Sequence, residues 1–323
     1  MSEAGKSTNG RLLRRLVDRA GTHALACGPT DGAPGRFPGY ILERRIGRGG
    51  MGATVYLARQ ISTGANVAIK VLPEEFAGDA AVARRFDREV RVMRSLRHPN
   101  VVRVVDSGGL PDGARFIVME YLPSGSLARH LKEGKRFETA SAVELIAKAC
   151  RALSMMHDCG IIHRDIKPSN ILLELSGNPK LCDFGLARLA DVSNSSRLTE
   201  SGDVIGTFGY MAPEQLQAKA KIDGRADTYS LGAVLYQLLT GSIPGGNARS
   251  PSVMRQDAAP FDAVVMRALE TDPARRFATA EGFRQALLAA PDLNRRQAFR
   301  RIVVGGIALA GIATGVWGAW RSR

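Results

Sequence analysis

The sequence feature that most restricts the fold is the run His163–Asn170, which reads H-R-D-I-K-P-S-N and is followed by D-F-G at residues 183–185. Asp165 supplies a carboxylate that can accept a hydroxyl proton, and Lys167 supplies a charge that can neutralise a moving phosphoryl group. The asparagine of the run and the aspartate of D-F-G supply oxygen ligands for magnesium. These residue types at this spacing meet the requirements of phosphoryl transfer.

A glycine-rich stretch between two predicted strands is the second informative feature. Residues 47–55 read G-R-G-G-M-G-A-T-V, or G-x-G-x-x-G-x-V, a pattern that a dinucleotide-binding fold also shows in part. Strands are predicted on both sides, at Tyr40–Leu42 and Thr54–Ala58, and no helix begins at the last glycine. The pattern therefore favours a β-hairpin that covers ATP phosphates closely.

A strand and a helix follow the glycine-rich stretch. The strand Asn66–Leu72 contains V-A-I-K and ends near Lys70, and Ala80–Leu96 has the apolar spacing of an amphipathic helix. Its predicted buried face consists of Val82, Phe86, Val90 and Met93. Glu89 lies on this helix. A glutamate on such a helix is usually a solvated charge, but the lysine upstream favours an ion pair between Glu89 and Lys70.

The apolar pattern also predicts two more strands and a long helix. The strands are expected at Val101–Val105 and Phe116–Tyr121, and the helix at Ser141–Asp158, directly before the catalytic-loop run. A mostly helical region is expected after it.

These motifs, in this order over roughly residues 40 to 290, resemble the eukaryotic-like (Hanks-type) bacterial serine/threonine protein kinases. The resemblance implies an α+β, two-lobed protein kinase fold. The N-lobe, 39–122, would hold a five-stranded antiparallel sheet plus helix αC, and the C-lobe, 123–290, would be mainly helical.

The resemblance also implies the roles of the site residues. Asp165 accepts the proton of a serine or threonine hydroxyl, Lys167 stabilises the γ-phosphoryl charge, and Mg2+ (or Mn2+) is bound by Asn170 and Asp183. The residues implied to bind ATP are Gly47, Gly49, Gly52, Val55, Ala68, Lys70, Glu89, Met119, Glu120, Leu122, Leu172 and Asp183.

Among these, Met119 is the implied gatekeeper, and the backbone of Glu120 and Leu122 faces the adenine edge. Val55, Ala68 and Leu172 would enclose the ring, although each apolar residue alone could equally be ordinary core.

Three residues outside the nucleotide site are implied to be structural. Asp227 should cap the catalytic-loop backbone, and Glu214 of A-P-E should pair with Arg276.

Only about twenty residues, rich in glycine, proline and serine, separate Gly241 from Phe261, so the additional helix that many relatives carry there is expected to be short or absent.

The segment between D-F-G and A-P-E is predicted to be regulatory. Thr199 and Ser201 resemble the autophosphorylation pair of bacterial receptor-like kinases, and Thr207 is expected to help seat the substrate hydroxyl.

The chain ends are predicted to differ from the catalytic region. Residues 1–38 should be a disordered basic segment, and 291–301 a basic linker. Ile302–Trp320 contains no charge and is long enough to span a bilayer as a single transmembrane helix. The expected location is the cell membrane, with the kinase domain cytoplasmic.

The formal net charge of +14 could indicate a nucleic-acid partner or a membrane surface. The chain shows no aromatic-plus-basic nucleic-acid motif, so membrane proximity is the favoured explanation and no nucleic acid is expected. The four cysteines lack C-x-x-C spacing, which argues against a disulfide framework or zinc site.

Two other function classes compete with a membrane-anchored kinase that phosphorylates protein substrates. A catalytically inactive scaffold is disfavoured because Lys70, Glu89, Asp165, Asn170 and Asp183 are all present. A small-molecule phosphotransferase is disfavoured by the segment through A-P-E, which builds a platform for a peptide.

Homodimerisation can be tested through the predicted membrane helix, where Gly311, Gly315 and Ala319 form a small-residue face. Replacing both Gly311 and Gly315 by leucine should weaken helix packing, and with it phosphorylation in trans. Self-association in membranes and activation-loop phosphate are the two measurements. Unchanged values of both would contradict the dimer hypothesis.

Overall fold

The structure is a computed structural model that describes residues 37–48, 53–72, 80–110, 114–184, 208–217 and 220–291. These residues form two compact units. The first contains the described residues up to His130 together with 168–184, and the second contains 131–167 together with 208–291.

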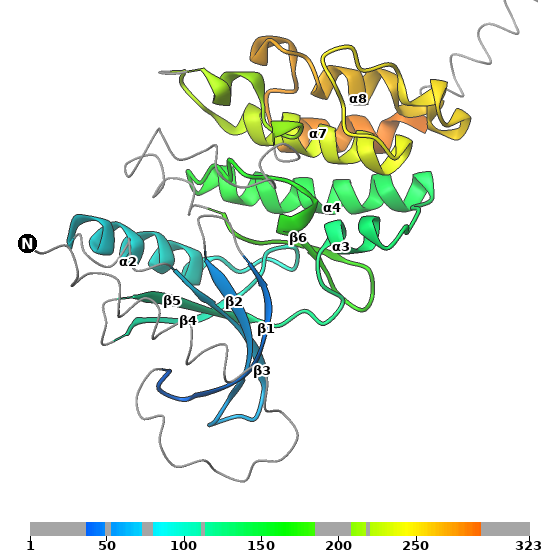
Figure 1. The fold of residues 1–323 in the computed structure, drawn as a ribbon. Coiled ribbons are helices and arrows are strands. Elements are labelled where there is room, and N and C mark those ends of the chain that lie inside the picture. Colours follow the sequence, from blue (N-terminus) through cyan, green and yellow to red (C-terminus); the bar gives the residue numbers. More distant parts are fainter. Residues whose placement is uncertain are drawn as a thin grey trace, which may run out of the picture. The chain divides into compact units, whose positions relative to one another are not determined.

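A five-stranded antiparallel sheet forms the main part of the first unit, in the order β1-β2-β3-β5-β4 (Figure 1). Its strands are β1 (Tyr40–Arg48), β2 (Thr54–Gln60), β3 (Asn66–Val71), β4 (Val104–Gly109) and β5 (Arg115–Glu120). The predicted five-stranded antiparallel sheet is therefore confirmed.

The predicted bounds of the fourth strand were wrong. Val101 forms a parallel bridge with Leu181, and the N–H of Val102 donates to the carbonyl of Leu181 over 2.9 Å. These residues therefore pair with the small hairpin of β6 (Ile171–Leu173) and β7 (Pro179–Leu181). Apolar spacing alone cannot tell which neighbour a short apolar run will pair with.

The central strand β3 directs alternate side chains to two different clusters, as a pleated strand must. Val67 and Ile69 lie in one apolar core with Phe116 and Val118. Lys70, one residue after Ile69, instead lines a pocket on the other side of the strand. The same six-residue strand thus contributes both to the core and to the candidate site.

Helix α2 (Ala80–Ser95) packs near β4 and also contributes to that pocket. Phe86, Val90 and Met93 are buried as the apolar spacing predicted, whereas the side chain of Val82 lies outside the described residues. Met93 reaches the pocket lined by Lys70.

Helices make up most of the second unit. They include α4 (Thr139–Asp158), α7 (Gly224–Thr240), α8 (Asp262–Ala268) and a helix at 280–291, and the shorter α3 (Leu127–Lys132) leads into the unit. Helix α7 packs against both α4 and α8 (Figure 1). It begins after the N-cap Asp223 and ends at Gly241, whose φ of 80° gives the left-handed C-cap that favours glycine.

The segment after α7 contains only short helical turns, which confirms the expectation that the additional helix is short or absent. The turns are η5 (Pro251–Val253) and η6 (Gln256–Phe261). Asp257 accepts the hydroxyl of Thr139 at the start of α4, over 2.6 Å, and so attaches this segment to the helical core.

None of the helices in the described ranges is long and apolar enough to cross a membrane. The predicted membrane segment 302–320 lies outside the described residues, as do residues 1–36 and the whole of 185–207.

Packing between α7 and α8 can be tested at Gly232. A Cβ atom at this position would lie 2.7 Å from the Cβ of Ala268. Gly232→Leu should therefore lower the free energy of unfolding by about 1–3 kcal/mol through overpacking, despite the better helix propensity of leucine. The midpoint of urea unfolding measures the change.

Gly245→Leu is the matched control, because a Cβ atom there meets no heavy atom within 4 Å. Its unfolding free energy should stay within about 0.5 kcal/mol of the wild type. Equal destabilisation by both substitutions would contradict the assigned packing.

Candidate active site

A small pocket in the first unit contains two of the charged residues that the motifs singled out, Lys70 and Asp183. The side chains that line it come from β3, α2, β4 and the residues just before it, β5, and the residues after β7. They are Lys70, Met93, Val102, Val104, Ile117, Met119, Cys182, Asp183 and Phe184. The pocket thus combines an apolar wall with one lysine and one aspartate.

The Nζ atom of Lys70 lies 2.8 Å from Oδ1 of Asp183, and Lys70 is only 3% exposed. An ion pair removed from water in this way needs close geometry to offset the cost of desolvation. The lysine implied to hold phosphate and the aspartate implied to hold metal therefore face the same space. The pairing of Lys70 with Glu89 stays a prediction, and Glu89 lies half-buried on α2.

Three of the residues implied to surround adenine gather in one apolar cluster. Leu122 is buried in it, and Met119 and Leu172 pack against it. The strand register places Val55 opposite Lys70, and Ala68 opposite both Leu57 and Met119. Val55, Lys70 and Ala68 consequently share one face of the sheet.

The backbone around Glu120 is partly occupied by contacts within the unit. Its N–H donates to the carbonyl of Arg103 over 3.0 Å. Its side chain accepts from the N–H of Arg103 and from Lys180, over 2.7 and 2.8 Å. The side chain of Glu120 therefore holds β5 to its neighbours, and the resemblance directs the backbone of Glu120 and Leu122 to adenine.

A backbone hydrogen bond links the two segments that carry the implied metal ligands. Asn170 ends the turn η3 (Pro168–Asn170), and its carbonyl accepts the N–H of Cys182 over 3.0 Å, directly before Asp183. Among the described residues no group of three or more His, Cys, Asp and Glu gathers as a metal site. One carboxylate and one amide suit Mg2+, which keeps water and phosphate oxygens in its shell.

The remaining implied nucleotide residues are glycines. Gly47 lies on β1 opposite Val55, with open space where a Cβ would point. Gly49 and Gly52 lie outside the described residues, as do Thr199, Ser201 and Thr207.

The catalytic-loop residues Asp165 and Lys167 lie in the second unit. The Nζ atom of Lys167 is 3.0 Å from Oδ1 of Asp165, and both side chains are partly exposed. A carboxylate with an adjacent ammonium group, open to solvent, can receive a proton and interact with an anionic group. His163, two residues before Asp165, is fully buried.

The buried carboxylate of Asp227 holds this loop, as predicted. It accepts the backbone N–H groups of His163 and Arg164, both over 2.8 Å. It also lies 2.8 Å from Nε2 of His157 on α4. One side chain of α7 therefore connects the catalytic loop to the helix that precedes it.

The catalytic loop and D-F-G both contain an unusual backbone conformation. Arg164 has a φ of 66° and Asp183 a φ of 63°, the left-handed region that non-glycine residues seldom adopt. Such a conformation costs on the order of 1–3 kcal/mol and persists only where surrounding contacts impose it. For Arg164 these contacts include Asp227 on its N–H and Gln215 on its carbonyl.

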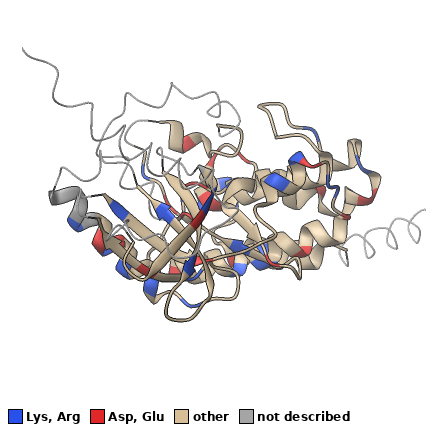
Figure 2. Cartoon of the chain, turned by 60° about the horizontal axis from the view of Figure 1, so that its bottom comes forward, with Lys and Arg blue, Asp and Glu red and all other residues tan. Residues whose placement is uncertain are grey.

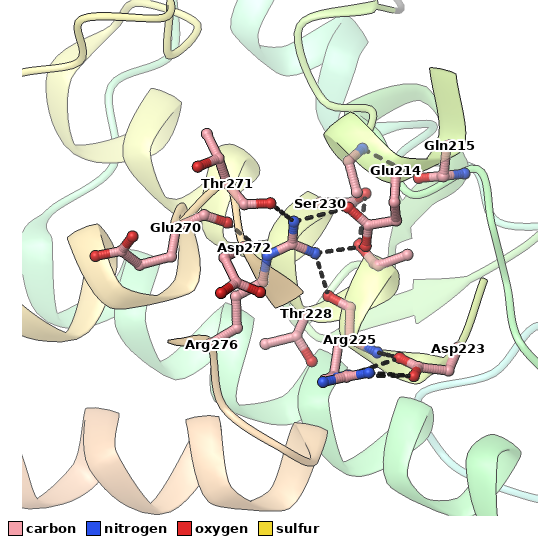
Figure 3. A network of polar contacts seen from close by, with 12 residues as sticks. Glu214, Gln215, Asp223, Arg225, Thr228, Ser230, Glu270, Thr271, Asp272 and Arg276 are labelled. Carbon is pink, nitrogen blue, oxygen red and sulfur yellow. Dashed lines mark hydrogen bonds and ion pairs between the residues drawn. The ribbon is translucent and has the colours of Figure 1, made fainter. Parts of the chain in front are cut away.

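The predicted pairing of Glu214 with Arg276 is confirmed. Two nitrogens of the guanidinium lie 2.6 and 2.7 Å from the two oxygens of Glu214, which is a bidentate contact (Figure 3). The same guanidinium donates to the carbonyls of Glu270, Thr271 and Arg225. Arg276 therefore connects A-P-E to α7 and to the segment after α8.

Sequence reasoning missed several residues that support the site. Gln215 donates to the carbonyl of Arg164 over 2.8 Å and accepts the N–H of Ala212 over 3.1 Å. Its position directly after A-P-E was the one available signal. The pairings of Lys180 with Glu120 and of His157 with Asp227 carried no local signal, because the partners lie 60 and 70 residues apart in the chain.

The protein kinase domain family matches residues 40–290 of this chain. The chain belongs to the protein kinase family. Its relatives include the serine/threonine-protein kinase Pkn1 of Myxococcus xanthus, 36% identical over 92% of this chain and 46% of the relative. PknB of Mycobacterium leprae is 38% identical over 77% of this chain and 42% of the relative. These are bacterial serine/threonine kinases of the eukaryotic-like type, as the motifs predicted.

A solved structure supports the same kinase fold. The kinase domain of Mycobacterium tuberculosis PknI, as its C20A mutant, is 32% identical with a TM-score of 0.64, and the match covers 83% of this chain and 99% of that one. The chain spans about half the length of the curated kinases that it matches.

The bidentate contact of Arg276 predicts that substitution of this arginine destabilises the protein much more than substitution of its neighbour Arg275. Arg276→Lys keeps the charge but loses the planar fork, and should lower the unfolding free energy by about 2–4 kcal/mol. Arg275→Lys is the matched control, because the Arg275 side chain is 68% exposed and its pair with Glu270 spans 3.4 Å.

The control substitution should cost less than about 0.5 kcal/mol. Chemical denaturation of the two variants and the wild type measures both values. Similar losses for both variants would show that the buried network does not stabilise the helical unit in this way.

Proposed function

We propose that this protein is a serine/threonine protein kinase that transfers the γ-phosphoryl group of Mg-ATP to hydroxyl groups of proteins. The observation that supports this most directly is the pair of Asp165 and Lys167 at 3.0 Å, on a loop whose backbone is capped by the buried Asp227. A nucleotide-binding scaffold has no need for a carboxylate and an ammonium group positioned in this way.

In the proposed reaction the first unit binds the nucleotide. The apolar residues Met119, Leu122 and Leu172 enclose adenine, and the backbone at Glu120 and Leu122 provides its polar contacts. Lys70 exchanges its contact with Asp183 for the α and β phosphates. Asn170 and Asp183 would hold magnesium, which would supply positive charge to neutralise the phosphate oxygens.

The catalytic loop carries out the transfer. Asp165 accepts the proton of the serine or threonine hydroxyl, whose oxygen forms a bond to the γ-phosphorus while the bond to the bridging oxygen of ADP breaks. Lys167 stabilises the negative charge on the moving phosphoryl group. The products are a phosphorylated side chain and ADP, and the proton resides on Asp165.

Regulation and location form part of the same proposal. Thr199 and Ser201 are the proposed autophosphorylation sites, and Ile302–Trp320 is the proposed single-pass anchor that holds a cytoplasmic kinase at the cell membrane. The uncharged length of that segment and the arginines on both sides of it support the assignment.

The proposed chemistry is tested by radiolabelled phosphate transfer with Asp165→Asn. Removing the proton acceptor should lower transfer to a protein substrate about 10²- to 10⁴-fold while ATP binding persists. Asp158→Asn is the matched control, because Asp158 is exposed at the end of α4 and outside the site. It should transfer phosphate at the wild-type rate.

Mapping of the labelled residues then tests autophosphorylation. Label on Thr199 or Ser201 in the wild type, and none in Asp165→Asn, is the expected result. Wild-type protein that binds nucleotide in membranes but transfers none would instead support the scaffold function.

A further inference from the structure

A second cavity lies wholly within the helical unit, between the end of α3 and the end of α7. Its volume is ≈ 210 Å3. It is lined by Leu131, Gly134, Lys135, Arg136, Gln237, Leu238 and Gly241. A water molecule occupies about 30 Å3 of liquid, so this space is large enough for a side chain rather than a single water.

The charges that line this cavity are both positive. Figure 2 shows that basic and acidic residues are interspersed along the described ribbon, and some form ion pairs, such as Lys148 with Glu144 at 2.8 Å. No aspartate or glutamate, by contrast, is among the described residues that line the cavity with Lys135 and Arg136. Lys135 lies 5.1 Å above the ring of Phe137, and Arg136 lies close to Gly241.

Arg255 holds the loop that carries these two cations. Its guanidinium donates to the carbonyl of Phe137 over 2.7 Å and pairs with Glu138 and Asp257. The side chain of Phe137 is itself buried. The loop is therefore attached to the helical core immediately after Arg136, so the cations are presented from a fixed backbone.

Gln237 connects the cavity to the segment that leads into A-P-E. Its Oε1 atom accepts the hydroxyl of Tyr210 over 2.6 Å. Burial raises the pKa of Tyr210 to about 12, so this hydroxyl stays protonated and keeps donating. The amide nitrogen of Gln237 is left as a further donor. Three donor side chains and no acid therefore line a cavity that adjoins the segment expected to seat a peptide.

We propose that this cavity binds an acidic side chain of the protein substrate, so that the kinase prefers sequences with a carboxylate near the acceptor hydroxyl. The proposal rests on the proposed kinase function and names the substrate class. A carboxylate accepts hydrogen bonds from lysine, arginine and an amide, and each such bond is charge-assisted. A basic side chain would meet Lys135 and Arg136 as like charges.

The test compares peptides that carry glutamate, alanine or lysine at each position on either side of a serine acceptor, with the full chain purified in detergent. At the position that reaches the cavity, glutamate should raise kcat/KM about fivefold to tenfold over alanine. The double variant Lys135→Ala, Arg136→Ala should lose that preference and keep the alanine peptide's rate.

Three further variants separate charge from packing. The double variant Lys135→Arg, Arg136→Lys keeps both charges and should keep the preference for glutamate. If Arg136 only stabilises the end of α7, peptide selectivity should not change in any variant. Lys132→Ala, on α3 and outside the lining, is the matched control and should behave as the wild type. Gln237→Glu retains an acceptor for Tyr210 and should shift the preference towards lysine.

Binding of a fluorescent peptide in which alanine replaces the acceptor serine tests this proposal separately from the kinase function. Tighter binding of the glutamate peptide to wild type than to the double variant would support the cavity assignment, whether or not any peptide is phosphorylated. A complete lack of phosphorylation would contradict the kinase function alone. Wild-type phosphorylation without any glutamate preference, or equal binding by both proteins, would overturn the proposal.

Discussion

The hydrogen bonds that the catalytic-loop backbone donates to Asp227 are the contacts on which the second unit's contribution to the site depends. The carboxylate is 1% exposed and accepts two consecutive backbone N–H groups, those of His163 and Arg164. A buried carboxylate is tolerated only where hydrogen bonds replace its water. Because α7 lies against α4 and α8, the loop is attached to a helix that packs against two others of its unit. The left-handed conformation of Arg164, and the position of Asp165 after it, follow from that attachment.

The same dependence on buried charge recurs at two other places. Lys70 faces Asp183 in the first unit, and Arg276 holds Glu214 in the second. Breaking a buried ion pair leaves an uncompensated charge, which costs more than the pair contributed in net stability. These pairs therefore specify one arrangement of the chain more than they add to its stability. At Lys70 the arrangement has a chemical use under the proposed function, in which phosphate oxygens replace the carboxylate of Asp183.

The second cavity differs from these buried pairs, because no acidic residue among the described ones lines it with Lys135 and Arg136. They stay solvated at modest cost because both side chains are exposed. A surface cation pair of this kind contributes little to folding. It is available for an anionic group from outside, and the attachment of its loop through Arg255 keeps it in place for that group.

The amino-acid sequence by itself determined the chemistry and most of the elements, because motif residues act through short spacings along the chain. Asp165 and Lys167 are two positions apart, and the alternation in β3 followed from six residues. Tertiary structure decided the pairings between distant segments: Val101 with Leu181, Gln215 with Arg164, and Lys180 with Glu120. Each of these pairs depends on how helices and strands pack, which no local pattern encodes. The cavity beside Gln237 arises in the same way, from the ends of two helices that are far apart in sequence.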